Sequence, residues 1–111
     1  MIPANFDYVA PLTLDEATHA LAESPGAKVL AGGMSLIPAM KHRLLQPGRL
    51  VDIARIAELN GVDEKRGRVR IGARTLHADL VAHPRLADYP IFGETASVIG
   101  DVQVRNRGTV G

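Results

Sequence analysis

The chain has 111 residues, of which 13 are Lys or Arg and 12 are Asp or Glu, giving a formal net charge of +1 at pH 7. This balance argues against a nucleic-acid or membrane-surface binder, which normally carries a marked basic excess. Hydrophobic residues make up 46% of the chain, which suits one small folded domain or part of a larger one. Because cysteine is absent, thiolate metal sites, iron–sulfur ligation, disulfides and a cysteine nucleophile are excluded within this chain.

The N-terminus of the chain does not resemble a targeting segment, and its C-terminus does not resemble a frayed tail. No basic stretch followed by an apolar one opens the sequence, and no apolar run approaches the ~20 residues that span a bilayer. We therefore expect no transmembrane segment and a cytoplasmic location. Glycines and β-branched residues over 101–111 resemble the approach to a further structured turn, so we expect the chain to be the first part of a longer protein.

The first element in chain order is an N-capped helix. Thr13 followed by Glu16 three residues later is the capping-box pattern. Apolar residues recur behind it at helical spacing, and Pro25 lies just after the last of them. The pattern predicts an amphipathic helix over 14–23.

A strand–helix–strand unit follows. Short apolar runs predict buried strands over 28–31 and 50–53, with a helix between them over 36–45. Ser35 is placed to cap this helix. Because the links are short, we expect parallel strands joined by a right-handed crossover.

The second half of the chain has a different texture. Two extended pieces, beginning at Val62 and covering 68–72, flank a polar turn over 63–67. The alternation of apolar and basic residues in the second piece predicts an antiparallel hairpin with one wet face. We then expect a helix over 76–83 capped by Thr75, and a further helix over 91–99. The fold class is therefore α+β, with a parallel βαβ subdomain followed by the start of an antiparallel one.

The strongest candidate site is the loop Ala31-Gly32-Gly33-Met34-Ser35 between a strand and a helix. Two glycines allow backbone torsions closed to other residues and let a ligand approach the main chain. Successive N–H groups there can form a concavity that binds a phosphate or pyrophosphate. The same residues equally suit a plain tight turn followed by a serine cap.

Other chemistries find little support in the sequence. The loop lacks the lysine of a Walker motif, the third glycine of a Rossmann motif and the second glycine of a nucleophile elbow, so Ser35 is not expected to act as a nucleophile. The four histidines show no metal-binding spacing, and we expect no metal site. The strip of Arg66, Arg68, Arg70 and Arg74 is interpreted as a solvated strand face without aromatic platforms for nucleic-acid bases. Tyr8 and Phe92 are expected in the core.

Several motifs together resemble one family over essentially the whole chain. They are 28–36, 52–53, 59–61, 71–73, 75–80 and 101–111. The sequence resembles the FAD-binding medium subunit of molybdenum hydroxylases, as in aerobic carbon monoxide dehydrogenase and xanthine dehydrogenase. The resemblance implies a truncated PCMH-type FAD-binding fold, with one subdomain over 1–58 and the incomplete second subdomain over 59–111.

The resemblance also implies which residues contact FAD. In the family the first glycine loop holds the FAD pyrophosphate through backbone N–H groups, and its flanks line the cofactor. A second motif follows, in which Val110 replaces the usual Ile and the chain stops before the next Gly and Asn or Ser. The residues implied as cofactor-binding are Lys28, Val29, Leu30, Ala31, Gly32, Gly33, Met34, Ser35, Leu36, Ile99, Gly100, Gly108, Thr109 and Gly111.

The function that the resemblance implies is electron transfer. In the family, substrate is hydroxylated at a molybdopterin centre on a large subunit, and two 2Fe–2S clusters on a small subunit carry electrons to FAD. The flavin passes them to NAD⁺, oxygen or a quinone. No catalytic residue is assigned within this chain, and the absence of cysteine agrees with cluster ligands on another chain.

Two alternatives stay open from the sequence. The chain could be a flavin-free module that keeps the fold for assembly. It could also belong to a flavoprotein oxidase of the vanillyl-alcohol type, which acts on its substrate directly. If the protein binds FAD, we expect the 111-residue piece alone to bind it weakly or not at all and to be inactive, because part of the FAD-binding cradle lies beyond its end.

Overall fold

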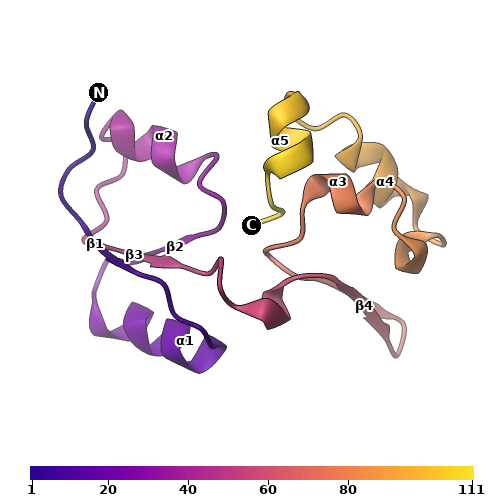
Figure 1. Cartoon of the computed structure of the whole chain (residues 1–111), viewed down its shortest axis with the longest axis horizontal. Coiled ribbons are helices and arrows are strands. Elements are labelled where there is room, and N and C mark those ends of the chain that lie inside the picture. Colours follow the sequence, from indigo (N-terminus) through magenta and orange to yellow (C-terminus); the bar gives the residue numbers. More distant parts are fainter. The chain divides into compact units, whose positions relative to one another are not determined.

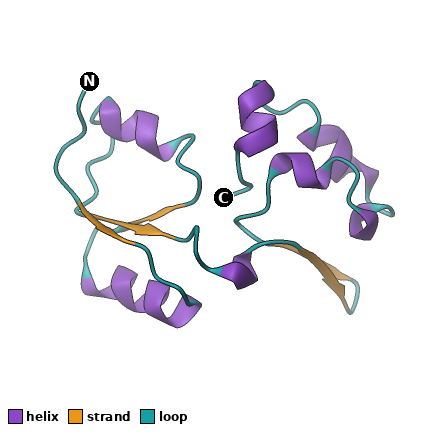
Figure 2. Cartoon of the chain, viewed as in Figure 1, coloured by secondary structure: helices purple, strands orange, loops and turns teal.

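The computed structural model describes residues 1–111 and divides into two compact units, Met1–Ala57 and Glu58–Gly111. Both units combine helices and strands (Figure 2), which confirms the α+β prediction. No helix has the length and apolar character needed to cross a membrane.

The first unit is built on a three-stranded parallel sheet. Its strands are β1 (Asp7–Val9), β2 (Lys28–Leu30) and β3 (Arg49–Asp52), in the order β1-β3-β2. The predicted parallel pairing of the two later strands is confirmed, with Val29 opposite Val51. The strand β1 was not predicted, because three mostly exposed residues are too few to show a strand period.

Two helices cover opposite faces of this sheet (Figure 1). They are α1 (Leu14–Glu23), as predicted, and α2 (Leu36–Lys41). The chain passes from β1 beyond β3 to β2 and then steps back to β3. Because parallel crossovers are right-handed, connections that run in opposite directions place their helices on opposite faces.

The N-terminus of α1 is capped as expected, with one difference. The Thr13 hydroxyl oxygen accepts a hydrogen bond from the Glu16 N–H at 3.1 Å. The Glu16 carboxylate accepts from the N–H of Leu12 at 3.0 Å. The return bond of the capping box therefore goes to the residue before the cap.

The helix α2 is shorter than the predicted 36–45 because its C-terminus turns into the left-handed region. Arg43 has φ 57°. Its N–H donates to the carbonyl of Met40 at 3.0 Å, and the N–H of Leu44 donates to that of Ala39 at 2.9 Å. These two bonds form a Schellman motif, which normally has glycine at the position of Arg43 and for that reason gave no sequence signal.

The prediction that residues 28–31 form a buried strand is wrong in one respect. The strand is present, but Val29 is 44% exposed, because β2 lies at the edge of the sheet. The buried strand is β3, where Leu50 and Val51 are 1% and 0% exposed. Two apolar runs of similar length look alike in sequence, and only the strand order decides which becomes central.

Tyr8 was expected in the core and is instead 55% exposed. Its ring extends from β1, and its hydroxyl donates a hydrogen bond to Oδ2 of Asp52 at the end of β3. The other oxygen of Asp52 accepts from the N–H of Ala54 at 2.9 Å. The hydrogen bond to Asp52, together with local desolvation and the negative charge of the carboxylate, raises the pKa of Tyr8.

We expect Tyr8 to ionise only at pH values above the ordinary tyrosine pKa of about 10. The neutral phenol makes the bond to Asp52, so its stabilising contribution is present below that pH. It is lost as the pH rises through the raised pKa of the folded state. A difference ultraviolet titration between the wild-type protein and Tyr8→Phe isolates this group. Asp52→Asn should lower the pKa of Tyr8, and an unchanged titration would contradict the contact.

The second unit begins with an antiparallel hairpin of β4 (Val62–Lys65) and β5 (Arg68–Ile71). This confirms the predicted hairpin and its alternation, since Val69 and Ile71 are partly buried and pack on the core of the unit. The turn is shorter than the predicted 63–67. Arg66 and Gly67 both have positive φ, 52° and 73°, as in the two-residue turns that suit strand twist.

Three α-helices and two 3₁₀ helices complete the second unit. They are η1 (Ala57–Leu59), which begins at the boundary, α3 (His77–Leu80), η2 (Pro84–Leu86), α4 (Pro90–Ala96) and α5 (Val102–Arg107). The predicted helix over 76–83 is shorter than expected, because α3 ends at Leu80 and Pro84 then begins η2. The predicted helix over 91–99 ends at Ala96. The sequence missed α5, although its N-cap Asp101 accepts a bond from the Val104 N–H at 2.9 Å.

Two side chains of this unit correct further predictions. Thr75 does not cap α3, because it is 1% exposed and bonded elsewhere. Phe92 is not in the core but 36% exposed, and it packs edge-to-face on Tyr89 with ring centroids 6.4 Å apart. The core consists instead of Val62, Leu80, Leu86 and Ala96.

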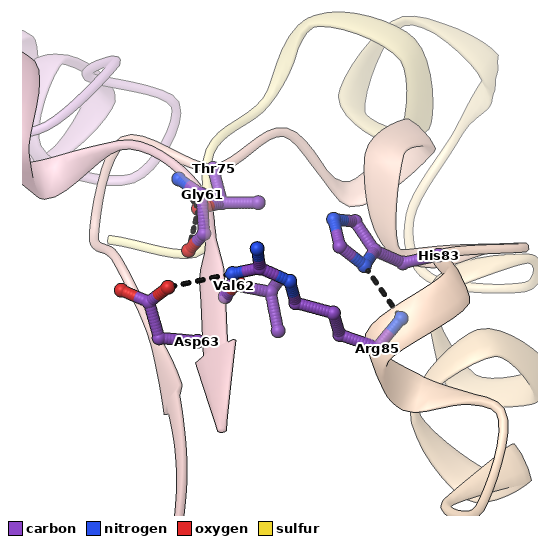
Figure 3. A network of polar contacts seen from close by, with 6 residues as sticks. All are labelled: Gly61, Val62, Asp63, Thr75, His83 and Arg85. Atoms are coloured by element: carbon purple, nitrogen blue, oxygen red, sulfur yellow. Dashed lines mark hydrogen bonds and ion pairs between the residues drawn. The ribbon is translucent and has the colours of Figure 1, made fainter. Parts of the chain in front are cut away.

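Thr75 fixes the start of the hairpin (Figure 3). Its hydroxyl oxygen accepts from the Gly61 N–H at 2.9 Å, and the hydroxyl donates to the Gly61 carbonyl at 3.1 Å. That carbonyl also accepts from the N–H of Gly72. Removing the hydroxyl therefore leaves one N–H without an acceptor while the carbonyl keeps a partner.

Thr75→Val is expected to lower the free energy of unfolding by about 1 to 3 kcal/mol, the cost of a buried N–H without an acceptor. Denaturant unfolding of the natural-length protein measures this change. Thr75→Ser keeps the hydroxyl and serves as the control, with a smaller loss that reflects only the missing methyl. Equal losses for both variants would contradict the role of the hydroxyl.

Candidate functional site

The glycine loop from Ala31 to Ser35 leaves the sheet at the end of β2 and enters α2. Gly32 and Gly33 both have left-handed torsions, with φ 74° and 82°. Two successive residues of this kind are inexpensive only for glycine. The loop therefore turns back on itself in a conformation that the residue types anticipated.

Three backbone donors in this loop have no acceptor within the chain. They are the N–H groups of Met34, Ser35 and Leu36, while the next N–H, that of Ile37, bonds to the Gly33 carbonyl at 3.0 Å. Ser35 makes no capping hydrogen bond, so the predicted serine cap is wrong. Consecutive free amides of this kind form a concavity that suits an anion.

The charge around the loop also suits an anion. No Asp or Glu occurs from residue 24 to residue 51, whereas Lys28 lies on β2 and Lys41 ends α2. Met34 is 47% exposed and Ser35 is exposed, so the loop is accessible. A diphosphate would meet amide donors there. Asp52, which the sheet register places opposite Leu30, is engaged by the Tyr8 hydroxyl and the Ala54 N–H.

The glycine at position 33 has a structural requirement beyond its torsion. A Cβ atom there would lie 2.8 Å from Cγ1 of Ile37 and 3.1 Å from Cδ1 of Leu30. Gly33 therefore allows the first turn of α2 to pack closely on β2. This close packing leaves no room for a side chain at position 33.

The flanks of the loop combine exposed and partly buried residues. Lys28 and Val29 on β2 are exposed, and Leu30 and Leu36 are partly buried. Of the flanking residues that the resemblance implies as lining the cofactor, two therefore face solvent and two lie against the turn.

The second glycine motif lies in the second unit and is held by backbone bonds. The N–H of Val110 donates to the Thr75 carbonyl at 2.8 Å, and the N–H of Gly111 donates to the Ala73 carbonyl at 2.9 Å. Thr109 forms an antiparallel bridge with Leu76. The sequence does not predict that the carbonyls of Ala73 and Thr75 accept these bonds, because backbone pairing across more than 30 residues leaves no local signal.

Gly108 is required where α5 ends. Its N–H donates to the Val104 carbonyl at 2.8 Å. A Cβ atom on Gly108 would lie 2.5 Å from that same carbonyl oxygen. Gly111 also has positive φ, 82°, with open space where a side chain would be. Glycine is therefore required at position 108 by the close contact with Val104, and it is favoured at position 111 by the left-handed torsion.

Ile99 and Gly100 lie between α4 and α5. Gly100 has φ 57°. Ile99 and Val110 line the same apolar pocket of about 320 Å³, together with Ile71 and Phe92. The fold thus brings Ile99 and Val110, which are 11 positions apart in the sequence, to one pocket of this unit. No group of three or more His, Asp or Glu side chains is arranged as a metal site anywhere in the described chain.

Comparison with known proteins identifies the family. Residues 4–111 match the model of the FAD binding domain in molybdopterin dehydrogenase. The carbon monoxide dehydrogenase medium chain of Hydrogenophaga pseudoflava is 49% identical over 113 residues, covering 100% of this chain and 39% of the relative. The glyceraldehyde dehydrogenase medium chain of Sulfolobus acidocaldarius is 40% identical over 112 residues, covering 100% and 40%.

The structural comparison agrees. Reconstituted CO dehydrogenase from Oligotropha carboxidovorans superposes with a TM-score of 0.92 at 43% identity, covering 100% of this chain and 40% of that one. The fold of this chain is thus shared with the CO dehydrogenase structure. The chain belongs to the family of FAD-binding domains of molybdopterin dehydrogenases. It spans about 39% of the length of the first of these relatives.

Proposed function

We propose that the protein is the FAD-binding electron-transfer subunit of a molybdenum hydroxylase, passing electrons from iron–sulfur clusters to an external acceptor. The observation that carries this proposal is the glycine loop, with free amides at Met34, Ser35 and Leu36, in a chain that matches the family over residues 4–111. Bound FAD would supply reversible redox chemistry between one- and two-electron partners. The protein contributes binding, orientation and the electrostatic surroundings.

Each part of the chain has a task in this proposal. The backbone of Ala31 to Ser35 holds the pyrophosphate, and its flanks line the cofactor. The second motif, held by backbone bonds within the second unit, contributes further FAD contacts, and Ile99 and Gly100 pack near the flavin ring. The residues proposed to contact FAD are Lys28, Val29, Leu30, Ala31, Gly32, Gly33, Met34, Ser35, Leu36, Ile99, Gly100, Gly108, Thr109 and Gly111.

The proposed partners are a large molybdopterin subunit and a small subunit with 2Fe–2S clusters, in the cytoplasm. Two observations support them. Relatives from two organisms are each named as the medium chain of a dehydrogenase. These 111 residues contain no cysteine, so they supply no thiolate ligand for such clusters.

The family match does not favour the two alternatives, a vanillyl-alcohol-type oxidase and a flavin-free assembly module. An oxidase of that type would turn over an organic substrate without iron–sulfur or molybdenum partners. A flavin-free module would be incubated with FAD and would still be colourless once the free FAD had been removed. Both alternatives can be tested on the same preparation of the natural-length protein.

The proposal is tested by expressing the natural-length protein, reconstituting it with FAD and recording the visible spectrum. We expect a stoichiometric flavin band and release of FAD on denaturation. A colourless natural-length protein would refute the proposal. Calorimetry with the 111-residue chain should show much weaker FAD binding than with the natural-length protein, and equal affinities would contradict a cradle shared with further residues.

A further inference from the structure

The outer face of the β4–β5 hairpin carries an unusual concentration of positive charge. In the register of the hairpin, Lys65 lies directly opposite Arg68, and Asp63 lies opposite Arg70. These four side chains share one face, because directly opposed residues of an antiparallel pair point the same way. Arg66 lies in the turn next to them. The five residues line a hollow of about 660 Å³.

These four cations form no ion pair within the 111 residues. Lys65, Arg66, Arg68 and Arg70 have no carboxylate within 4.0 Å. The single acid on the face, Asp63, is engaged by Nη1 of Arg85 at 2.7 Å, as Figure 3 shows.

Glu64 belongs to the other face of the hairpin. It is paired with Val69 in the register, and its carboxylate accepts a bond from the hydroxyl of Tyr89 at 3.5 Å. It therefore does not offset the charge of the outer face.

The arrangement opposes the stability of the hairpin. Like charges directly opposite one another on a sheet are destabilising, and Lys65 and Arg68 are such a pair. The whole chain has a net charge of only +1, so the basic face is a local feature and does not follow from the composition.

From this face we infer that the outer surface of the hairpin docks an extended, carboxylate-rich segment of a partner protein. Arg68 and Arg70 are two residues apart on one strand, which places them about 6.6 Å apart along it. An extended segment with acidic residues at alternating positions has the same spacing. Arginine forks bind carboxylates with two parallel hydrogen bonds.

Other anions fit the surface less well. The four cations are all exposed, whereas a small anion is held tightly by donors that are already desolvated and fixed. The face has no aromatic side chain on which a nucleic-acid base could stack. Figure 2 shows the turn of the hairpin extending beyond the helices of its own unit.

The test measures binding of the natural-length protein to a synthetic peptide of alternating Glu and Ser at low ionic strength. We expect Arg68→Gln combined with Arg70→Gln to weaken binding roughly fivefold, as the loss of two exposed ion pairs implies. Added salt should weaken binding as well. Arg68→Lys combined with Arg70→Lys keeps the charge and should retain most of the affinity.

The matched control is Arg43→Gln combined with Arg55→Gln, which removes the same charge from exposed positions outside the hairpin. This variant should bind the peptide like the wild-type protein. Equal weakening by both double variants would overturn the inference, because it would reflect net charge alone. It would also be overturned by no peptide binding, or by tighter binding of inorganic phosphate or a single-stranded oligonucleotide.

Discussion

Replacing Gly33 with valine in the natural-length protein is expected to abolish FAD binding and to lower the free energy of unfolding by about 2 to 5 kcal/mol. A branched side chain disfavours the left-handed torsion of this residue by about 1 to 2 kcal/mol. Its Cβ atom would also overlap Ile37, at 2.8 Å from Cγ1, and overpacking of this kind costs about 1 to 3 kcal/mol. Displacing the first turn of α2 would move the amides of Met34 and Ser35.

Flavin content and denaturant unfolding measure the two effects of Gly33→Val separately. Gly26→Val is the matched control, because Gly26 has φ 79° and open space around the position of its Cβ atom. It carries the torsional cost alone and should keep its FAD. If the two variants were equally stable, the close packing at Gly33 would be contradicted. A stable Gly33→Val protein with full FAD content would argue against the role of the loop.

Gly72→Ala is the second substitution with a large expected effect, a loss of about 3 kcal/mol or more in the free energy of unfolding. A Cβ atom on Gly72 would lie 2.1 Å from the carbonyl oxygen of Leu59 and 2.5 Å from its carbon. That carbonyl accepts a bond from the N–H of Arg74 at 2.9 Å, and the N–H of Gly72 donates to Gly61. Because the obstacle is backbone, no side-chain rotation can relieve the overlap.

The control for Gly72→Ala is Gly48→Ala, since a Cβ atom on Gly48 meets nothing within 4 Å and its φ is not left-handed. That change should be neutral or slightly stabilising, by up to about 1 kcal/mol. Thermal unfolding of the natural-length proteins compares the two. A small effect of Gly72→Ala would show that the backbone around Leu59 can shift freely.

Local patterns were sufficient where the cause of a structure lies within a few residues. The bounds of α1 follow from its cap and its stripe, and the β4–β5 hairpin follows from alternation around a turn. The left-handed torsions of Gly32 and Gly33 follow from residue type. The resemblance to the family rested on motifs of the same local kind, and the comparisons confirm it.

Tertiary packing overrode local patterns in several elements. Thr75 and Ser35 both have the residue type of a helix cap, yet Thr75 is buried against Gly61 and Ser35 makes no capping bond. The helix α2 ends early, at Lys41, because Arg43 has a left-handed torsion that its residue type does not predict. Tyr8 is drawn to Asp52 at the end of another strand, 44 residues away.

What the sequence determined by itself was therefore a set of local conformations: the capped helix over 14–23, the alternating hairpin and the left-handed turn at Gly32 and Gly33. These depend on neighbours within one helical turn or one hairpin. The tertiary structure alone decided which apolar strand became central, which capping residue was used for another bond, and which cations gathered without a carboxylate. Each of these depends on contacts between residues distant in the chain, and the energies of such contacts are not encoded in any short segment.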